Sequence, residues 1–431
     1  MSPKGLNRLQ NLVILLLTVS AVFLFASLPM FGALSDRSLL ELARDRVHRE
    51  RGIEQAGAAS ATQLALPVRI VYTNDFARFG TDALTTLSDE FERAGAYLSE
   101  ALGSVGAPTL VSESVFLNAL RGKGLYFDLT APLPTELFSD ILGVTIAGPP
   151  VTNVRRILLT PLGGGEAALY LQDGAGTCCH FSTAVDSLAL EDFLASQSGS
   201  GADFAFQLGT DYARLSPYTL VLSDPAPCRV LGASALLSSG GEETFLRRAG
   251  FNAHAENRFT ESSGTVLVRE ASGALYLRPD GTVEFQGAEA APDSIYFIPA
   301  AEPDAPTLSE AATAAQALAS ALVQDLLGDA ALCLSAAQEA DGRCELCFDL
   351  LSNGTPIRFA DGSHALTITT EGQSVTGFRL KARRYALGEE TAELLPVPFS
   401  AAIAGVWSDA ELLIAYVDAG GEEVLPTWIA E

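Results

Sequence analysis

Lysine is scarce in this chain of 431 residues. It occurs only at Lys4, Lys123 and Lys381, whereas Asp and Glu together number 52, and the formal net charge is −25. Proteins that bind nucleic acid neutralise phosphates with clustered Lys and Arg, and a strong excess of negative charge opposes such binding. The composition therefore excludes nucleic acid as a partner, and solubility is a sufficient reason for the acidic surface.

Signatures of common enzymes are also missing. The G-x-S-x-G motif of serine hydrolases, the H-E-x-x-H motif of zinc peptidases and the phosphate loop G-x-x-x-x-G-K-[ST] do not occur. The histidines lack the spacing of metal-ligand pairs; they are His48, His180, His254 and His364. We therefore predict a non-enzymatic protein without catalytic residues, cofactor or metal. A pair of carboxylates, which is enough for glycoside hydrolysis, is an alternative that so acidic a chain leaves open.

The cysteines allow three interpretations; they are Cys178, Cys179, Cys228, Cys333, Cys344 and Cys347. We expect them to be small buried apolar side chains. A disulfide that uses Cys333 is one alternative. A zinc site formed by Cys333, Cys344 and Cys347 with His364 is the other. The zinc site has a geometric difficulty, because Cys344 and Cys347 would point to opposite faces of a strand.

An N-terminal apolar run has the length of a membrane span. The 20 residues 12–31 read LVILLLTVSAVFLFASLPMF and carry no charge. As a helix they extend about 30 Å, the thickness of a hydrocarbon core. Because Lys4 and Arg8 precede the run, the positive-inside rule places residues 1–11 in the cytoplasm and the C-terminal bulk outside. We predict a single-pass protein of the cell membrane; a cleaved signal peptide is the alternative.

Small residues within this run are candidates for partner contacts. Helices associate in lipid by close packing at small side chains, although a G-x-x-x-G pattern is absent here. The candidate positions are Thr18, Ser20, Ala21, Ala26 and Ser27. The alternative is that they only lower the hydrophobicity of the anchor.

The chain behind the anchor begins with helical and mixed patterns. Residues 36–62 predict a juxtamembrane helix. Residues 67–235 alternate helical and strand-like patterns, which predicts an α+β domain. Within it, apolar residues every three or four positions predict a helix over 81–102, and a shorter helix is expected over 135–142.

Strand patterns dominate the remainder. Residues 236–300 contain three short strands, and Asp280-Gly281 between two of them predicts a type I′ turn. Residues 301–431 predict one helix followed by an antiparallel sheet. The expected fold class is a multi-domain α+β ectodomain of antiparallel sheets with packed helices, behind one transmembrane helix.

Four segments, in this order, resemble the YycH/YycI-type proteins of Gram-positive bacteria, which are membrane-anchored regulators of a cell-wall sensor histidine kinase. YFDLTAPLPTELFSDILG resembles the strand, proline-rich turn and helix of the first domain. The second segment resembles the middle hairpin module, FDLLSNGTPIRF resembles a hairpin of the last domain, and the fourth resembles the ending of the longer, YycH-like member. The segments are Tyr126–Gly143, Asn257–Gly287, Phe348–Phe359 and Leu412–Glu431.

The resemblance implies a function without catalysis. Such proteins lie beside the kinase, contact it through the membrane helix and the ectodomain, and change its activity. It therefore implies a membrane sensor histidine kinase as partner, with a second, YycI-like regulator as a possible further one. Two other functions stay open: an extracytoplasmic binding module for a cell-wall sugar or peptide, and a cell-wall hydrolase with paired carboxylates or a Cys/His site.

The charge asymmetry around residues 12–31 gives a testable topology. A reporter that is active only outside the cytoplasm, fused after Glu431, should be active, and the mature protein should keep its N-terminus. N-terminal sequencing of the product measures the second part. A soluble product that begins after Phe31 would instead establish a signal peptide.

Overall fold

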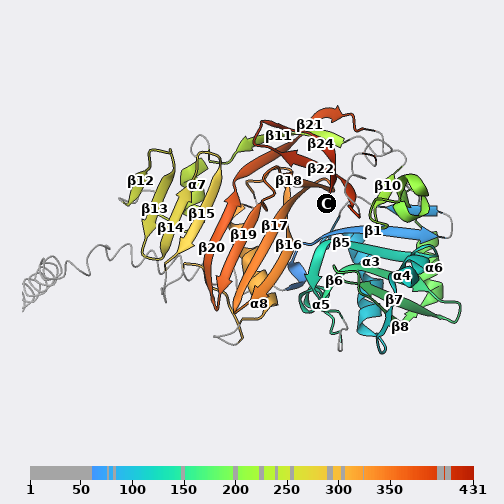
Figure 1. Ribbon diagram of the computed structural model, residues 1–431. Coiled ribbons are helices and arrows are strands. Elements are labelled where there is room, and N and C mark those ends of the chain that lie inside the picture. The colour runs from blue at the N-terminus through green and yellow to red at the C-terminus, as the bar shows by residue number, and fades with distance from the viewer. Residues whose placement is uncertain are drawn as a thin grey trace, which may run out of the picture. The chain divides into compact units, whose positions relative to one another are not determined.

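Figure 1 shows the computed structural model of the chain. The structure describes residues 61–74, 77–80, 84–146, 151–197, 202–222, 228–237, 241–252, 257–288, 295–301, 306–323, 325–395, 402 and 409–431. They belong to one compact unit, Ile53–Glu431. The predicted segments 1–11 and 12–31 and nearly all of 36–62 lie outside the described residues. Among the helices that are described, none is long and apolar enough to span a membrane.

The first large sheet is antiparallel and eight-stranded within the described residues. Its order is β2-β1-β5-β6-β7-β8-β4, with β3 paired to β1. The strands are β1 (Pro67–Asn74), β2 (Ala77–Gly80), β3 (Leu84–Thr85), β4 (Thr109–Val111), β5 (Gly124–Pro134), β6 (Asn153–Pro161), β7 (Glu166–Gln172) and β8 (Cys178–Asp186). The short η2 (Ala61–Gln63) precedes β1.

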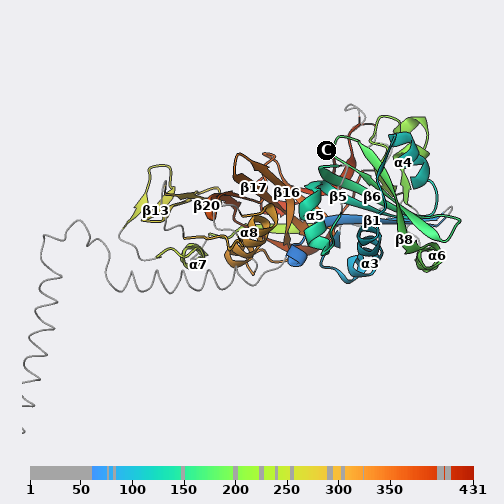
Figure 2. The same cartoon turned by 90° about the horizontal axis from the view of Figure 1, so that it is seen from below.

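Both faces of this sheet are covered. Side chains alternate between the faces along a strand, so Ile70 enters one core and Val71 the other. Helices α3 and α6 lie on one face and α4 lies on the other (Figure 2). The second face also packs against the small β9–β10 sheet through Phe204 and Leu220. These elements are α3 (Asp89–Gly103), α4 (Glu113–Leu120), α5 (Thr135–Leu142), α6 (Ser187–Ala195), β9 (Ala202–Phe204), η3 (Ala205–Gln207), η4 (Thr210–Tyr212) and β10 (Leu220–Leu222).

The second large sheet has eleven described strands (Figure 1). Its order is β12-β13-β14-β15-β20-β19-β17-β18-β22-β24, with β16 paired to β17, and all pairs except β18–β22 are antiparallel. The strands are β12 (Arg258–Thr260), β13 (Val266–Glu270), β14 (Gly273–Leu277), β15 (Thr282–Gly287), β16 (Ala331–Ala340), β17 (Arg343–Ser352), β18 (Thr355–Phe359), β19 (Leu366–Glu371), β20 (Ser374–Lys381), β22 (Leu412–Asp418) and β24 (Pro426–Ala430).

Helices α7 (Gly241–Arg248) and α8 (Leu308–Val323) lie on the same face of this sheet (Figure 2). Apolar residues of its inward rows, such as Phe285, Phe378 and Ile368, are almost fully buried. Alternate residues on the same strands point to the other face and are largely polar. A further three-stranded sheet is formed by β21 (Arg383–Ala392), β11 (Cys228–Ala235) and β23 (Glu423–Val424).

The predicted α+β class with antiparallel sheets and packed helices is confirmed. The predicted modules 67–235, 236–300 and 301–431, however, share sheets. Strand β15 of the second module pairs with β20 of the third, and β11 of the first pairs with β21 of the third. The division therefore describes the sequence pattern, whereas strand pairing continues across both boundaries.

Local signals gave one precise helix and one wrong boundary. The prediction for 135–142 matches α5, which ends at Gly143 in the left-handed conformation (φ +66°). The helix predicted from residue 81 instead begins at Asp89, because Leu84 and Thr85 pair with β1 and the Ser88 hydroxyl caps the helix.

Two hairpin turns differ in type. Asn353 and Gly354 both have positive φ, as a type I′ turn requires. The type I′ prediction for Asp280-Gly281 is wrong, because of these two only Gly281 has positive φ (+82°). The Gly281 N–H donates to the Arg278 carbonyl (3.0 Å) and the Arg278 N–H to the Thr282 carbonyl (2.8 Å). This is a three-residue loop in which glycine occupies the left-handed position.

Replacing Gly281 by Val should lower the free energy of unfolding by about 1–2 kcal/mol, since a β-branched residue resists positive φ. Urea denaturation of the full-length chain measures the change. Gly163→Val is the matched control, because a side chain there meets open space. Equal stability of the two variants would contradict the argument.

Candidate functional site

Charged side chains converge where the first sheet meets the segment before β22. Arg69 of β1 lies opposite Asp128 of β5, and Asp128 lies opposite Arg156 of β6. Residues directly opposite in antiparallel strands point to the same face, so these three groups are neighbours. Asp128 is only 3% exposed. A buried carboxylate of this kind requires cationic partners.

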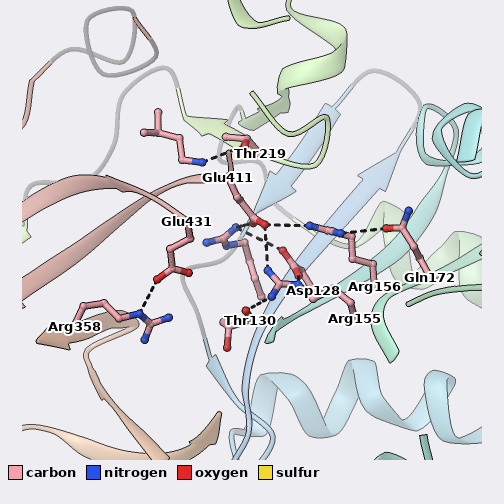
Figure 3. A network of polar contacts seen from close by, with 11 residues as sticks. Asp128, Thr130, Arg155, Arg156, Gln172, Thr219, Arg358, Glu411 and Glu431 are labelled. Carbon is pink, nitrogen blue, oxygen red and sulfur yellow. Dashed lines mark hydrogen bonds and ion pairs between the residues drawn. The ribbon is translucent and has the colours of Figure 1, made fainter. Parts of the chain in front are cut away.

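Glu411 brings a second carboxylate from the other sheet. Its backbone pairs with that of Glu431, and its side chain accepts hydrogen bonds from Arg155 Nη2 (3.1 Å) and Arg156 Nη2 (3.1 Å). Arg69 Nη1 lies 3.4 Å from Glu411 Oε1. Figure 3 shows the Glu411 side chain directed at the guanidiniums of Arg155 and Arg156. The carboxylate thus joins strands that belong to two different sheets.

Arg155 reaches the same place because of an irregularity in β5. The register between β5 and β6 shifts between Asp128 and Leu133. Arg155 Nε donates to Asp128 Oδ1 (3.1 Å), and its Nη1 donates to the Thr130 carbonyl (Figure 3). Arg155 is therefore bonded to both carboxylates. We call Arg69, Asp128, Arg155, Arg156 and Glu411 the charge network.

Polar contacts extend from the charge network into the first sheet. Arg156 Nη1 donates to Gln172 Oε1 (3.2 Å), and its guanidinium lies 4.1 Å from the centre of the Tyr218 ring. Gln172 Nε2 donates to the Tyr218 hydroxyl (2.6 Å), which donates to Glu113 Oε1 (2.8 Å). This chain of contacts holds Arg156 in one orientation.

The two carboxyl groups differ in their affinity for protons. Burial disfavours ionisation of Asp128, but Arg155, Arg156 and Arg69 outweigh burial and hold its pKa below the usual value. Burial and the negative charge of Asp128 raise the pKa of Glu411, although the arginines oppose this. Asp128 is therefore the permanent anion, and Glu411 is the group that binds a proton first.

Three guanidiniums facing two carboxyl groups form a joint between the first sheet and the segment before β22. Arg156 Nε and the Tyr126 hydroxyl are buried there without a hydrogen-bond partner, which costs stability. Buried ion pairs contribute little net stability but are costly to break. What the network specifies is the position of β22 against the first sheet.

The structure tests some of the site predictions made from the sequence and leaves others untested. Thr18, Ser20, Ala21, Ala26 and Ser27 lie outside the described part of the chain, so their partner contacts stay a prediction. Five of the cysteines, all except Cys228, are buried and form no disulfide. Among the described residues no group of His, Cys, Asp and Glu is placed to hold a metal ion.

The zinc alternative fails for the geometric reason given above. Cys344 enters the core on the helix-covered face, whereas Cys347 lies on the opposite face beside His364. What lies near His364 is Asp349, whose Oδ1 is 2.9 Å from His364 Nδ1. The structure thus brings together one cysteine, one histidine and one aspartate.

The sequence contains a signal for the charge network. Asp128 interrupts an apolar strand, GLYFDL, and Arg155-Arg156 interrupt another, NVRRILL. Charges inside otherwise apolar strands indicate buried partners. Nothing local, however, could identify Glu411, which lies 256 residues from Arg155.

The comparisons with known proteins give a fold. No protein-family model matches the chain, and no curated protein matches it. Among solved structures, the chain is similar to the crystal structure of YycH from Bacillus subtilis, with 11% sequence identity and a TM-score of 0.51. The match covers 86% of this chain and 94% of that one. The chain therefore has a YycH-like fold.

Glu411→Ala should lower the free energy of unfolding by about 3–5 kcal/mol, because it leaves three guanidiniums facing one carboxylate. Glu411→Gln should cost less, since an amide resembles the protonated carboxyl group. Chemical denaturation of the full-length chain measures both, with the exposed Glu423→Gln as control. If Glu411→Ala lowered the free energy of unfolding no more than the control does, the charge network would not hold the two sheets together.

Proposed function

We propose that this chain is a non-enzymatic, membrane-anchored regulator of a two-component sensor histidine kinase that controls cell-wall metabolism. The observation that carries the proposal is the YycH-like fold, which extends over 94% of the YycH chain rather than over one module. The four sequence segments that resemble YycH/YycI-type proteins, and that occur in the same order as in those proteins, point to the same family. The predicted anchor at 12–31 would place the protein in the cell membrane, with its bulk outside.

Two physical features would support regulation: confinement of this chain and the kinase to one membrane, and a fixed arrangement of the sheets in the ectodomain. Two proteins in one membrane have a high effective concentration, so weak contacts in the bilayer and outside it become sufficient together. The charge network fixes β22 against the first sheet, so the ectodomain would present its surfaces to the kinase as one body. A second, YycI-like regulator would be a further partner in this arrangement.

A second candidate function is an extracytoplasmic binding module, and one groove favours it. The groove has a volume of about 730 Å³ and lies on the polar face of β15, β20, β19 and β17. Pockets of this size hold small molecules. Its aromatic lining residues, Phe285 and Phe378, are 1% and 3% exposed, so they offer little ring surface for a sugar. A peptide-like ligand that carries positive and negative groups suits the lining better than a sugar does.

The test of the proposed function replaces residues 12–31 by an unrelated membrane helix of equal length and orientation. Cross-linking of the full-length chain in membranes, followed by mass spectrometry, should capture a sensor histidine kinase. In the chimera, capture and the change in kinase output should fall, while membrane location and ectodomain folding persist.

Two outcomes would contradict parts of the proposal. Unchanged capture in the chimera would exclude the membrane helix as a contact. Capture of no histidine kinase by the parent chain would contradict the regulatory role and leave the binding module as the better account.

A further inference from the structure

The groove on the polar face of the second large sheet has a partly bare floor. Strands β15, β20 and β19 contribute the facing residues Gln286, Gly377 and Thr369, and all three line the groove. Gly377, in the middle of this row, has no side chain. Glycine inside a strand often marks a place where a ligand or another backbone approaches closely. The backbone of β20 is therefore accessible to a ligand here.

A β-bulge lies beside this glycine. Gly377 faces Thr369, whereas Val375 faces Thr370, so Thr376 is an extra residue of β20. The Thr376 hydroxyl donates to the Thr369 carbonyl (3.3 Å). Bulges interrupt regular strand pairing and are frequent next to active sites. Glycine and bulge thus interrupt an otherwise regular sheet face at the groove.

Arg379 supplies the groove with a cation whose donors are unused. It is exposed and faces Glu284 on one side and Thr367 on the other. Glu284 is already engaged, because it accepts from Arg278 Nη2 (2.7 Å) and Gln286 Nε2 (2.9 Å). Within the described part of the chain, no hydrogen bond or ion pair holds the Arg379 guanidinium. Its planar set of N–H donors matches a carboxylate.

Glu371 supplies an anion farther along the groove. It lies on β19, four residues from Thr367, and alternate residues of a strand share one face. Four residues of a strand span about 13 Å. Glu371 pairs with Arg343 (3.3 Å), but both side chains are more than half exposed. Such a pair is worth little, so an ammonium group can replace Arg343 beside Glu371 at small cost.

A cation and an anion at this separation match the two ends of a short peptide. An extended peptide advances about 3.3 Å per residue, so about 13 Å corresponds to about four residues. A neutral sugar would leave the Arg379 guanidinium without an anionic partner. A ligand with negative charge alone is opposed by the net charge of −25. The lining therefore favours a zwitterion of peptide length.

We propose that the groove binds a free peptide of about four residues, with its C-terminal carboxylate at Arg379 and its amino group at Glu371. The main chain of the peptide would cross the bare floor at Gly377. This inference rests on the second candidate function, the binding module, and adds to it the ligand class and the two residues that recognise the ends of the ligand.

Tetra-alanine is the probe, because it offers only a peptide backbone and two charged ends. Isothermal titration calorimetry with the full-length chain in detergent measures its affinity. Its C-terminal amide and its N-acetyl derivative should each bind at least about tenfold more weakly, because each lacks one charged end. Tetra-alanine that does not bind the parent chain, or equal affinities for the three peptides, would overturn the proposal.

Two variants assign the ends of the peptide. Arg379→Gln should weaken tetra-alanine about tenfold and leave the C-terminal amide unchanged, because the amide has no carboxylate to lose. Glu371→Gln should likewise weaken tetra-alanine and leave the N-acetyl peptide unchanged. Arg247→Gln is the matched control, since this exposed arginine is on α7, which lies on the helix-covered face (Figure 2). If Arg379→Gln weakened acid and amide equally, the assignment would be wrong.

Peptide length is the last variable. Di-alanine is too short to reach both Arg379 and Glu371 and should bind at least about tenfold more weakly than tetra-alanine. Equal affinity for the two would contradict a site with two separate ends. These experiments involve no kinase. Their failure would remove the peptide site alone, whereas failure of the regulatory proposal would show in the capture of the kinase.

Discussion

Glu411 places a carboxyl group, on the segment before β22, among three arginines of the other large sheet, and much of the described structure depends on this contact. Arg69, Arg155 and Arg156 come from two strands whose buried residues are mostly apolar. Without Glu411, Asp128 would be the one carboxylate among these guanidiniums. Electrostatics thus fixes the position of one sheet against the other, because the penalty for leaving buried charges unpaired is large while the gain from pairing them is small.

A fixed joint of this kind suits a protein whose proposed role is recognition. Hydrophobic packing between sheets tolerates small displacements, whereas a carboxylate with three guanidinium partners within 3.4 Å has one geometry. The proposed kinase regulator would need its surfaces in a constant arrangement.

Local sequence signals predicted the fold class because the relevant physics is local. The helix over 135–142 is capped by Gly143, and the Asn353-Gly354 turn needs only its own two residues. The start of α3 was missed because a tertiary contact decided it: residues 84–85 pair with β1 instead of continuing the helical pattern. The charge network was missed for the same reason, since its members are distant in sequence. The zinc alternative grouped Cys333, Cys344 and Cys347 with His364, but strand geometry puts Cys344 and Cys347 on opposite faces of β17, and the residue beside the His364 ring is Asp349.

In its proposed role, this chain would change the activity of a sensor histidine kinase as an anchored, rigid ectodomain. The most direct measurement is the rate of kinase autophosphorylation in liposomes that contain the kinase alone, with the full-length chain, or with its Glu411→Ala variant. The account predicts that the full-length chain changes this rate and that the variant, inserted to the same extent, changes it much less. An autophosphorylation rate that is the same in all three preparations would contradict the account.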